Sequence, residues 1–339
     1  MIRRIWTGSL SALGLLLLIL DAKTALYGAS EGLTLCLRSV IPSLFPFFIL
    51  SILLTDSLTG LRFSVLRPVG RLCGIPEGGE SLLAVGLLGG YPVGAQSVAQ
   101  AYRAGQLNKQ DAGRMLGFCS NAGPAFLFGI VAAKFSQHWI PWALWAIHIF
   151  SALLVGSLLP NKSERAVHLP TQKQSSLSDA LRRSISVMAG VCGWVVLFRV
   201  ILAFLDRWCM WLLPDSAQVA LTGLLELANG CCELDGIENT GLRFLICSAI
   251  LGFGGLCVTM QTVSVTEGLA LGWYLPGKLL QGLISVLLAA LLQAMVFPQA
   301  ERVYISPVFL IGIAAILAFS VILLRRYEKK SSIPAAVGV

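Results

Sequence analysis

The stretch GLLGGYPVGAQSVAQAY, residues 86–102, interrupts an apolar chain with four glycines, one proline, two glutamines and one serine. Backbone that leaves a regular helix inside hydrocarbon must find hydrogen-bond partners in the protein or in a wet cavity. Arg71 precedes the stretch and Arg103 follows it, and basic loops stay in the cytoplasm. The sequence therefore predicts a re-entrant helical hairpin over residues 81–102, which enters the membrane and returns to the same face.

The composition of the whole chain indicates a membrane protein. Of its 339 residues 56% are hydrophobic and 12% are charged, and the mean hydropathy is +0.79. About a quarter of the residues of a soluble domain are charged. We therefore predict an all-α polytopic protein of the bacterial inner membrane, with the lipid bilayer as its solvent. The net charge of +8 comes mainly from loops between apolar runs, so no nucleic-acid partner is expected.

Catalytic and metal-binding patterns do not occur in the sequence. The nine cysteines and three histidines show no metal-ligand spacing. A nucleophile elbow, a P-loop and an HExxH motif are also lacking. We therefore expect no enzyme, no metal and no cofactor. The expected partners are a small-molecule solute and a coupling ion, Na⁺ or H⁺, and the sequence is compatible with an oligomer.

Apolar runs and basic loops divide the chain into segments. We expect an N-terminal transmembrane helix over 1–30, a first repeat over 31–160, a polar cytoplasmic linker over 161–183, a second repeat over 184–325 and a cytoplasmic tail over 326–339. The apolar runs lie at 1–20, 32–54, 139–159, 186–205, 217–230, 243–265, 278–297 and 305–324. The charge rule places both termini in the cytoplasm, and the number of crossings in the second half stays open.

A weak similarity links the two halves. GGYPVGAQSV (89–98) and GGLCVTMQTV (254–263) coincide at half of their positions, with Gln96 opposite Gln261. Secondary transporters are built from inverted repeats whose broken helices meet near the membrane midplane. We therefore expect two inverted repeats, each with a re-entrant hairpin and broken helices, and a site between them. The alternative is that the glycines allow tight packing and the glutamines bond neighbouring helices.

Polar groups near the expected breaks are the candidates for a site. In SNAGP (120–124), the proline removes the amide hydrogen that would bond residue 120, so the preceding polar groups face the break. The predicted substrate-binding residues are Gly90, Tyr91, Pro92, Gly94, Gln96, Ser97, Ser120, Asn121, Thr259, Gln261, Thr262 and Arg199. Glu226 and Asn229 are the predicted ion-coupling residues, because an intramembrane carboxylate indicates a functional site. The alternative is that Glu226 is solvated at the interface.

Three basic residues lie near the ends of apolar runs. Arg38, Arg199 and Lys278 are expected to extend toward the membrane surface, as long basic side chains do. A basic residue that instead turned inward would favour an anionic solute.

Three segments resemble those of a known family. IPSLFPFFILSILL (41–54), GGYPVGAQ (89–96) and CSNAGPAFLFG (119–129) are similar to the sporulation integral membrane protein YlbJ family, whose members carry nucleoside-recognition Gate domains. The resemblance covers about residues 30 to 325. It implies a fold related to concentrative nucleoside transporters, with two repeats and two hairpins. It also implies that sporulating members help to move dipicolinic acid toward the forespore.

The family's motifs fall on particular residues of this chain. The resemblance assigns the first hairpin to Gly90, Tyr91, Pro92, Gly94 and Gln96, and the helix break to Ser120, Asn121 and Pro124. The expected function is transport of a small polar metabolite, anionic or nucleoside-like. The first alternative is a non-transporting scaffold for spore or envelope assembly, which predicts that the polar hairpin residues are buried and bonded to one another, with no cavity. The second is a membrane enzyme, which predicts acid, base or metal ligands clustered at one interface.

Overall fold

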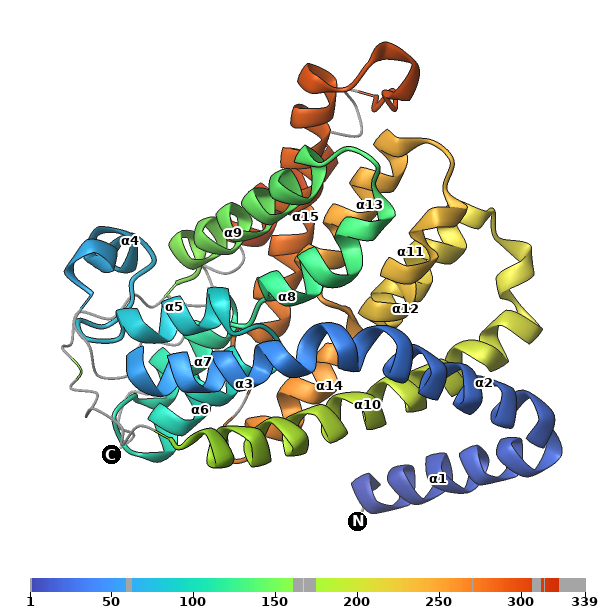
Figure 1. Cartoon of the computed structure of the whole chain (residues 1–339), viewed down its shortest axis with the longest axis horizontal. Coiled ribbons are helices and arrows are strands. Elements are labelled where there is room, and N and C mark those ends of the chain that lie inside the picture. The colour runs from blue at the N-terminus through green and yellow to red at the C-terminus, as the bar shows by residue number, and fades with distance from the viewer. Residues whose placement is uncertain are drawn as a thin grey trace, which may run out of the picture.

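The computed structural model describes residues 2–58, 63–160, 167, 175–269, 271–306, 312–313 and 315–322. Within these ranges the secondary structure is helical and no β-strand occurs (Figure 1). Five helical segments of the described residues are long and apolar enough to cross a membrane: Ala22–Leu58, Trp139–Leu158, Leu177–Trp208, Thr240–Val265 and Tyr274–Val296. The predicted class, an all-α polytopic membrane protein, is confirmed.

The first half of the chain runs from α1 to α9. Its helices are α1 (Ile2–Leu20), α2 (Ala22–Leu35), α3 (Ile41–Leu58), α4 (Arg67–Leu72), α5 (Glu80–Leu88), α6 (Val93–Arg103), α7 (Lys109–Leu116), α8 (Pro124–Phe126) and α9 (Trp139–Leu158). A π-helical turn, Cys36–Val40, joins α2 to α3. The boundary expected at residue 30 falls inside α2. The chain divides earlier, where Asp21 caps α2 by accepting a hydrogen bond from the Thr24 amide (3.3 Å).

The second half runs from α10 to α15. Its helices are α10 (Leu177–Trp208), α11 (Asp215–Leu225), α12 (Leu227–Cys232), α13 (Thr240–Phe253), α14 (Gly255–Val265) and α15 (Tyr274–Val296). The last part of the expected linker, from Leu177 onward, belongs to α10. The expected tail and most of the expected linker, and residues 307–311, 314 and 323–324 of the last apolar run, lie outside the described residues.

The opening stretch forms a helical hairpin. Helices α5 and α6 pack against each other and turn back at Gly89–Pro92, where Gly90 has φ 74° and the Tyr91–Pro92 peptide is cis. The arms have 9 and 11 residues, too short to cross a hydrocarbon core of about 30 Å. At Gly94 a Cβ would lie 2.2 Å from the Cys119 carbonyl oxygen, so glycine lets α6 pack directly on the segment after α7.

A second hairpin lies where the sequence comparison does not place it. Helices α11 and α12 pack against each other and turn back at Glu226, whose backbone is extended (φ −138°, ψ 112°). Segment 254–263, expected as the second hairpin, instead belongs to a broken spanning helix. There Gly254 and Gly255, with φ of 85° and 84°, separate α13 from α14. The expected pairing of 89–98 with 254–263 therefore matches a hairpin tip with a helix break and is wrong.

The order of elements is alike in the two halves. Each has a long helix, a short hairpin, a broken helix and a further long helix: α2–α3, α5–α6, α7–α8 and α9 in the first, and α10, α11–α12, α13–α14 and α15 in the second. Helix α10 packs along α2 and α3, while α9, α13 and α15 pack together. Figure 1 shows the hairpins approaching from opposite ends, α5–α6 from the left and α11–α12 from the right.

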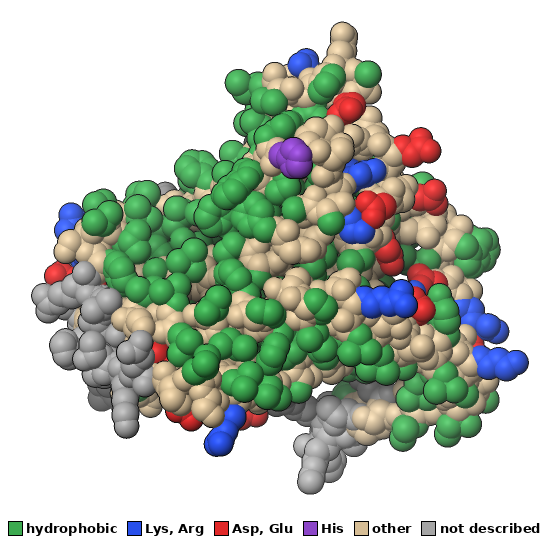
Figure 2. Space-filling model, viewed as in Figure 1, with side chains coloured by type: hydrophobic (Ala, Val, Ile, Leu, Met, Phe, Trp, Pro, Cys, Tyr) green, Lys and Arg blue, Asp and Glu red, His purple; other side chains and the backbone are tan. Residues whose placement is uncertain are grey.

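The molecular surface fits a lipid environment. Large apolar side chains are exposed on the long helices, among them Leu37, Leu50, Trp142, Phe150 and Leu291. In Figure 2 apolar side chains cover much of this face, and many of the charged ones gather near its right-hand margin. An exposed apolar surface of this kind is stable in hydrocarbon and marks a membrane or protein interface.

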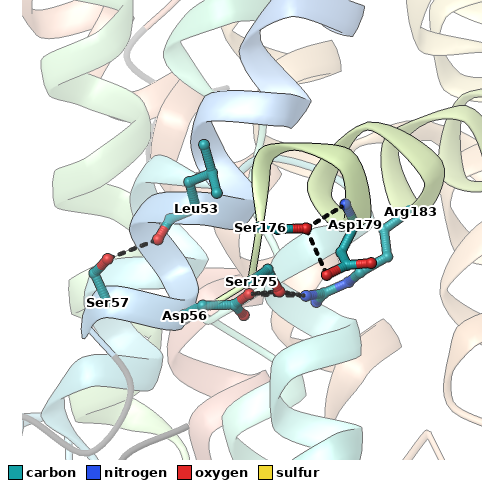
Figure 3. Close-up of polar contacts among 7 residues, drawn as sticks. All are labelled: Leu53, Asp56, Ser57, Ser175, Ser176, Asp179 and Arg183. Atoms are coloured by element: carbon teal, nitrogen blue, oxygen red, sulfur yellow. Dashed lines mark hydrogen bonds and ion pairs between the residues drawn. The ribbon is translucent and has the colours of Figure 1, made fainter. Parts of the chain in front are cut away.

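One buried ion pair ties the two halves together. Asp56 near the end of α3 accepts hydrogen bonds from Arg183 of α10 (2.9 Å) and from Ser175 (Figure 3). The Asp56 side chain is 2% exposed and that of Arg183 is 38% exposed. Ser176 caps α10 by accepting a hydrogen bond from the Asp179 amide (3.1 Å). The start of α10 is thereby held against the end of α3.

Candidate solute-binding site

Both hairpin tips, the first helix break and α14 meet at one cavity. Its lining includes Gly90 and Tyr91 from the first tip, Gly123 from the first break, Glu226 from the second tip and Gln261 from α14. The remaining wall comes from apolar side chains of α3 and α10, including Phe47, Phe48, Val191 and Val195. The volume open to the centre of a water molecule is about 50 Å³. Most of the lining is apolar, and the polar side chains in it are those of Tyr91, Glu226 and Gln261. A cavity of this size has room for a few waters or a small group that can reach those polar side chains.

Glycine is required where these segments touch. A Cβ at Gly123 would lie 2.9 Å from the Gly90 Cα, so the first tip and the first break are in backbone contact. A Cβ at Gly254 would lie 2.7 Å from the Tyr91 hydroxyl oxygen, which joins the first tip to the second break. A Cβ at Gly255 would lie 3.2 Å from the Gly223 carbonyl oxygen, next to the second tip. Small residues thus allow four backbone interruptions to converge.

A buried lysine lies beside this cavity. Lys278 of α15 has no exposed surface, and its ammonium donates to the Tyr91 hydroxyl (3.2 Å), Asn121 Oδ1 (3.3 Å) and Gln281 Oε1 (2.7 Å). Gln281 Nε2 donates to the same Asn121 oxygen (3.0 Å) and to the His148 carbonyl (3.2 Å). One network therefore joins the hairpin tip, the helix break, α9 and α15.

The inward turn of Lys278 corrects the sequence prediction. We expected this side chain to extend toward the membrane surface, because it lies near the start of an apolar run. Lys278, Gln281 and Ser285 recur at helical spacing and are all buried, so they form one polar stripe on α15. That spacing is the sequence signal that could have revealed the inward face. Arg38, by contrast, is exposed on the surface of the protein.

Glu226 is buried at the tip of the second hairpin and caps α12. Its carboxylate accepts hydrogen bonds from the Ala228 amide (3.1 Å), the Asn229 amide (2.6 Å) and the Asn229 side chain (2.7 Å). The side chain is 2% exposed, so the alternative of a solvated interfacial carboxylate is wrong. Amide donors and the positive end of a helix both stabilise a carboxylate. The carboxylate lines the cavity, and its role in ion coupling stays a prediction.

Several predicted site residues have structural contacts instead. Ser97 donates to the Val93 carbonyl (3.0 Å), Thr259 to the Gly255 carbonyl (3.1 Å) and Thr262 to the Tyr274 hydroxyl (3.3 Å). Gly94 packs on the Cys119 carbonyl, as described above. The Ser120 hydroxyl is buried next to the break without a hydrogen-bond partner among the described residues. Of these residues, none is part of the cavity lining.

Arg199 also lies apart from the cavity. Its guanidinium forms an ion pair with Asp206 on the same helix (3.0 Å), and its backbone packs against Gly28 of α2. Arg199 is not among the residues that line the cavity. The structure therefore brings Lys278, rather than Arg199, to the hairpin tips.

A second cavity adjoins the first. It is lined by Pro92 and Gln96 of the first hairpin, by Gln261, and by α10 residues that include Ser186 and Trp194. Its volume open to water centres is about 170 Å³. Gln261 and Val191 line both cavities, so the two spaces share a wall. The expected approach of Gln96 and Gln261 therefore occurs, although the segments that carry them are not equivalent elements.

These features define a class of protein: a multi-pass, all-α membrane protein with a cavity enclosed by broken helices. The chain is 26% identical over 328 residues to the sporulation integral membrane protein YlbJ of Bacillus subtilis strain 168. The aligned region covers 81% of this chain and 79% of that protein. This similarity supports the assignment of the chain to the YlbJ family. No family model matches the chain, and no solved structure matches it.

Proposed function

We propose that this protein transports a small polar metabolite, anionic or nucleoside-like, across the membrane. The cavity at which both hairpin tips, the first helix break and α14 meet is the observation that carries the proposal. Interrupted helices present unpaired backbone groups and helix ends, which bind polar solutes and ions in secondary transporters. The scaffold alternative predicts no cavity at the hairpins, so the cavity supports transport over it.

The groups around the cavity fit this role. Tyr91 and Gln261 supply a hydroxyl and an amide, which can donate and accept hydrogen bonds. Glu226 supplies a carboxylate for a coupling cation, Na⁺ or H⁺. The second cavity, between α6, α10 and α14, is the proposed route by which the solute enters or leaves. Movement of the α5–α6 hairpin against α10 would open or close the wall at Gln261.

We propose a role in sporulation, because the similar Bacillus subtilis protein is named for it. Dipicolinate, which the family resemblance implies, is therefore the first solute to test, with uridine as the nucleoside. We also propose an inner-membrane location with both termini in the cytoplasm. Fusions of green fluorescent protein or alkaline phosphatase to the C-terminus distinguish the two orientations, and phosphatase activity there would overturn this placement.

Uptake into proteoliposomes tests the transport function. Purified protein is reconstituted into liposomes, and labelled dipicolinate or uridine is added outside, with Na⁺ or pH gradients applied in separate arms. We expect uptake of one solute class above that of empty liposomes. Gln261→Ala should reduce it at least several-fold, because the side chain lines both cavities. Gln100→Ala is the matched control, since Gln100 of α6 lines neither. Absence of uptake and of ligand-induced thermal stabilisation for every solute would favour the scaffold.

A further inference from the structure

The strongest unexplained feature near the cavity is the charge of Lys278. Its three hydrogen-bond acceptors are neutral oxygens of Tyr91, Asn121 and Gln281. Among the described residues, no carboxylate lies within 4.0 Å of its ammonium. A buried ammonium costs several kcal/mol of free energy unless an opposite charge compensates it. A neutral amide at this position would fill the same three acceptor contacts less well but would not carry that cost.

The buried arginine among the described residues has electrostatic support. Arg114 is buried, and it donates to the Gly156 and Pro160 carbonyls at the end of α9, where the helix dipole favours a cation. Lys278 lies in the second turn of α15, which begins at Tyr274. In the described part of the chain, no carbonyl end of a helix supports the ammonium there, in contrast to Arg114. The position of Lys278 is therefore unfavourable by burial, which indicates a functional use of its charge.

Tyr91 connects this charge to the cavity. An ammonium has no lone pair, so in their 3.2 Å contact the Tyr91 hydroxyl accepts and Lys278 donates. The Tyr91 hydroxyl keeps its own hydrogen for donation, and the contact with an ammonium makes it a stronger donor. Tyr91 lines the cavity. Glu226, at the other hairpin tip, already accepts three hydrogen bonds from its own helix. The cavity therefore has a donating side and an accepting side.

We propose that Lys278 sets a preference for solutes with an anionic oxygen, acting through the Tyr91 hydroxyl. In this arrangement Lys278 is a positioning residue. It holds Tyr91 at the tip, polarises its hydroxyl and supplies the positive potential that an anionic oxygen compensates. The inference deepens the proposed transport function and rests on it. It names the residue that discriminates an acid from its uncharged analogue.

The test compares a matched pair of ligands on the full-length protein in detergent. Dissociation constants are measured for dipicolinate and for its uncharged diamide, which has a similar shape. The wild type should prefer the dianion. Lys278→Met should lower this preference roughly tenfold or more, because a charge-assisted interaction is lost. Lys278→Arg should keep much of it. Tyr91→Phe, which leaves the ammonium in place, should also lower it.

A control separates this effect from loss of a lysine in general. Lys134, the last residue of the 3₁₀ turn Ala132–Lys134, forms an ion pair with Asp235 (2.5 Å), and Lys134→Met should leave the preference unchanged. Equal weakening of both ligands by Lys278→Met, or an unchanged ratio in Tyr91→Phe, would overturn the inference while leaving transport standing. Tight binding of the diamide or of uridine without preference for the dianion would do the same. If the wild type binds no compound, the result overturns both the proposed function and this inference.

Discussion

Substitution of Gly254 tests whether the contact between the second helix break and Tyr91 organises the site. Gly254 has φ 85°, and a Cβ there would lie 2.7 Å from the Tyr91 hydroxyl oxygen. Gly254→Ala therefore combines two costs. A left-handed conformation with a Cβ costs about 1–2 kcal/mol, and overpacking against a buried side chain adds about 1–3 kcal/mol.

The chain contains a matched control for the first cost. Gly268 has φ 81°, and a Cβ there would meet nothing within 4 Å. Gly268→Ala should lower the free energy of unfolding by about 1–2 kcal/mol, whereas Gly254→Ala should lower it by about 2–5 kcal/mol. The difference isolates the steric contact with Tyr91. The measurement is equilibrium unfolding by titration with dodecyl sulfate in mixed micelles, supported by thermal melting.

A double-mutant cycle tests whether the Tyr91 hydroxyl is the group that the Cβ added by Gly254→Ala contacts. In a Tyr91→Phe background the hydroxyl is gone, so Gly254→Ala should cost about 1 kcal/mol less than in the wild type. Movement of Tyr91 should also break its 3.2 Å contact with Lys278, so Gly254→Ala should weaken dipicolinate binding while Gly268→Ala should not. Equal destabilisation by the two glycine substitutions, or no coupling to Tyr91→Phe, would refute the reasoning.

Three further predictions concern the buried charges. Arg183→Ala should destabilise the protein by about 1–2 kcal/mol more than Asp56→Ala does. The first variant leaves a buried carboxylate without its partner, whereas the second leaves an arginine that can reach solvent. The reverse order of melting temperatures would contradict this. Arg114→Met should cost about 3 kcal/mol or more, because it leaves carbonyl oxygens at the end of α9 without their charged donor, and a melting temperature within error of the wild type would show that water replaces it. Glu226→Gln should abolish uptake driven by an ion gradient but keep solute exchange at equal ion concentration, whereas loss of both activities would assign Glu226 to solute binding or to folding.

The sequence alone determined the membrane class, the hairpin turning at Gly89–Pro92 and the helix break around SNAGP. These features follow from local chemistry. A low fraction of charged residues leaves too little polar surface for water, and glycine and proline clustered in an apolar run weaken a helix locally, whereas a single proline such as Pro46 stays inside α3. The same local signals predict Tyr91 and Asn121 as candidate site residues.

Only the tertiary structure decided how the interruptions are used. The break at Gly254 continues a spanning helix and the one at Glu226 reverses the chain, although glycines mark the first and a glutamate the second. The direction of Lys278 was likewise settled by Tyr91 and Asn121, which lie 187 and 157 residues away in the chain. A helix end turns back, and a lysine points inward, according to the partners that neighbouring helices supply. The spacing of Lys278, Gln281 and Ser285 marks a polar face of α15, but the partners of that face come from distant segments, which no local pattern specifies.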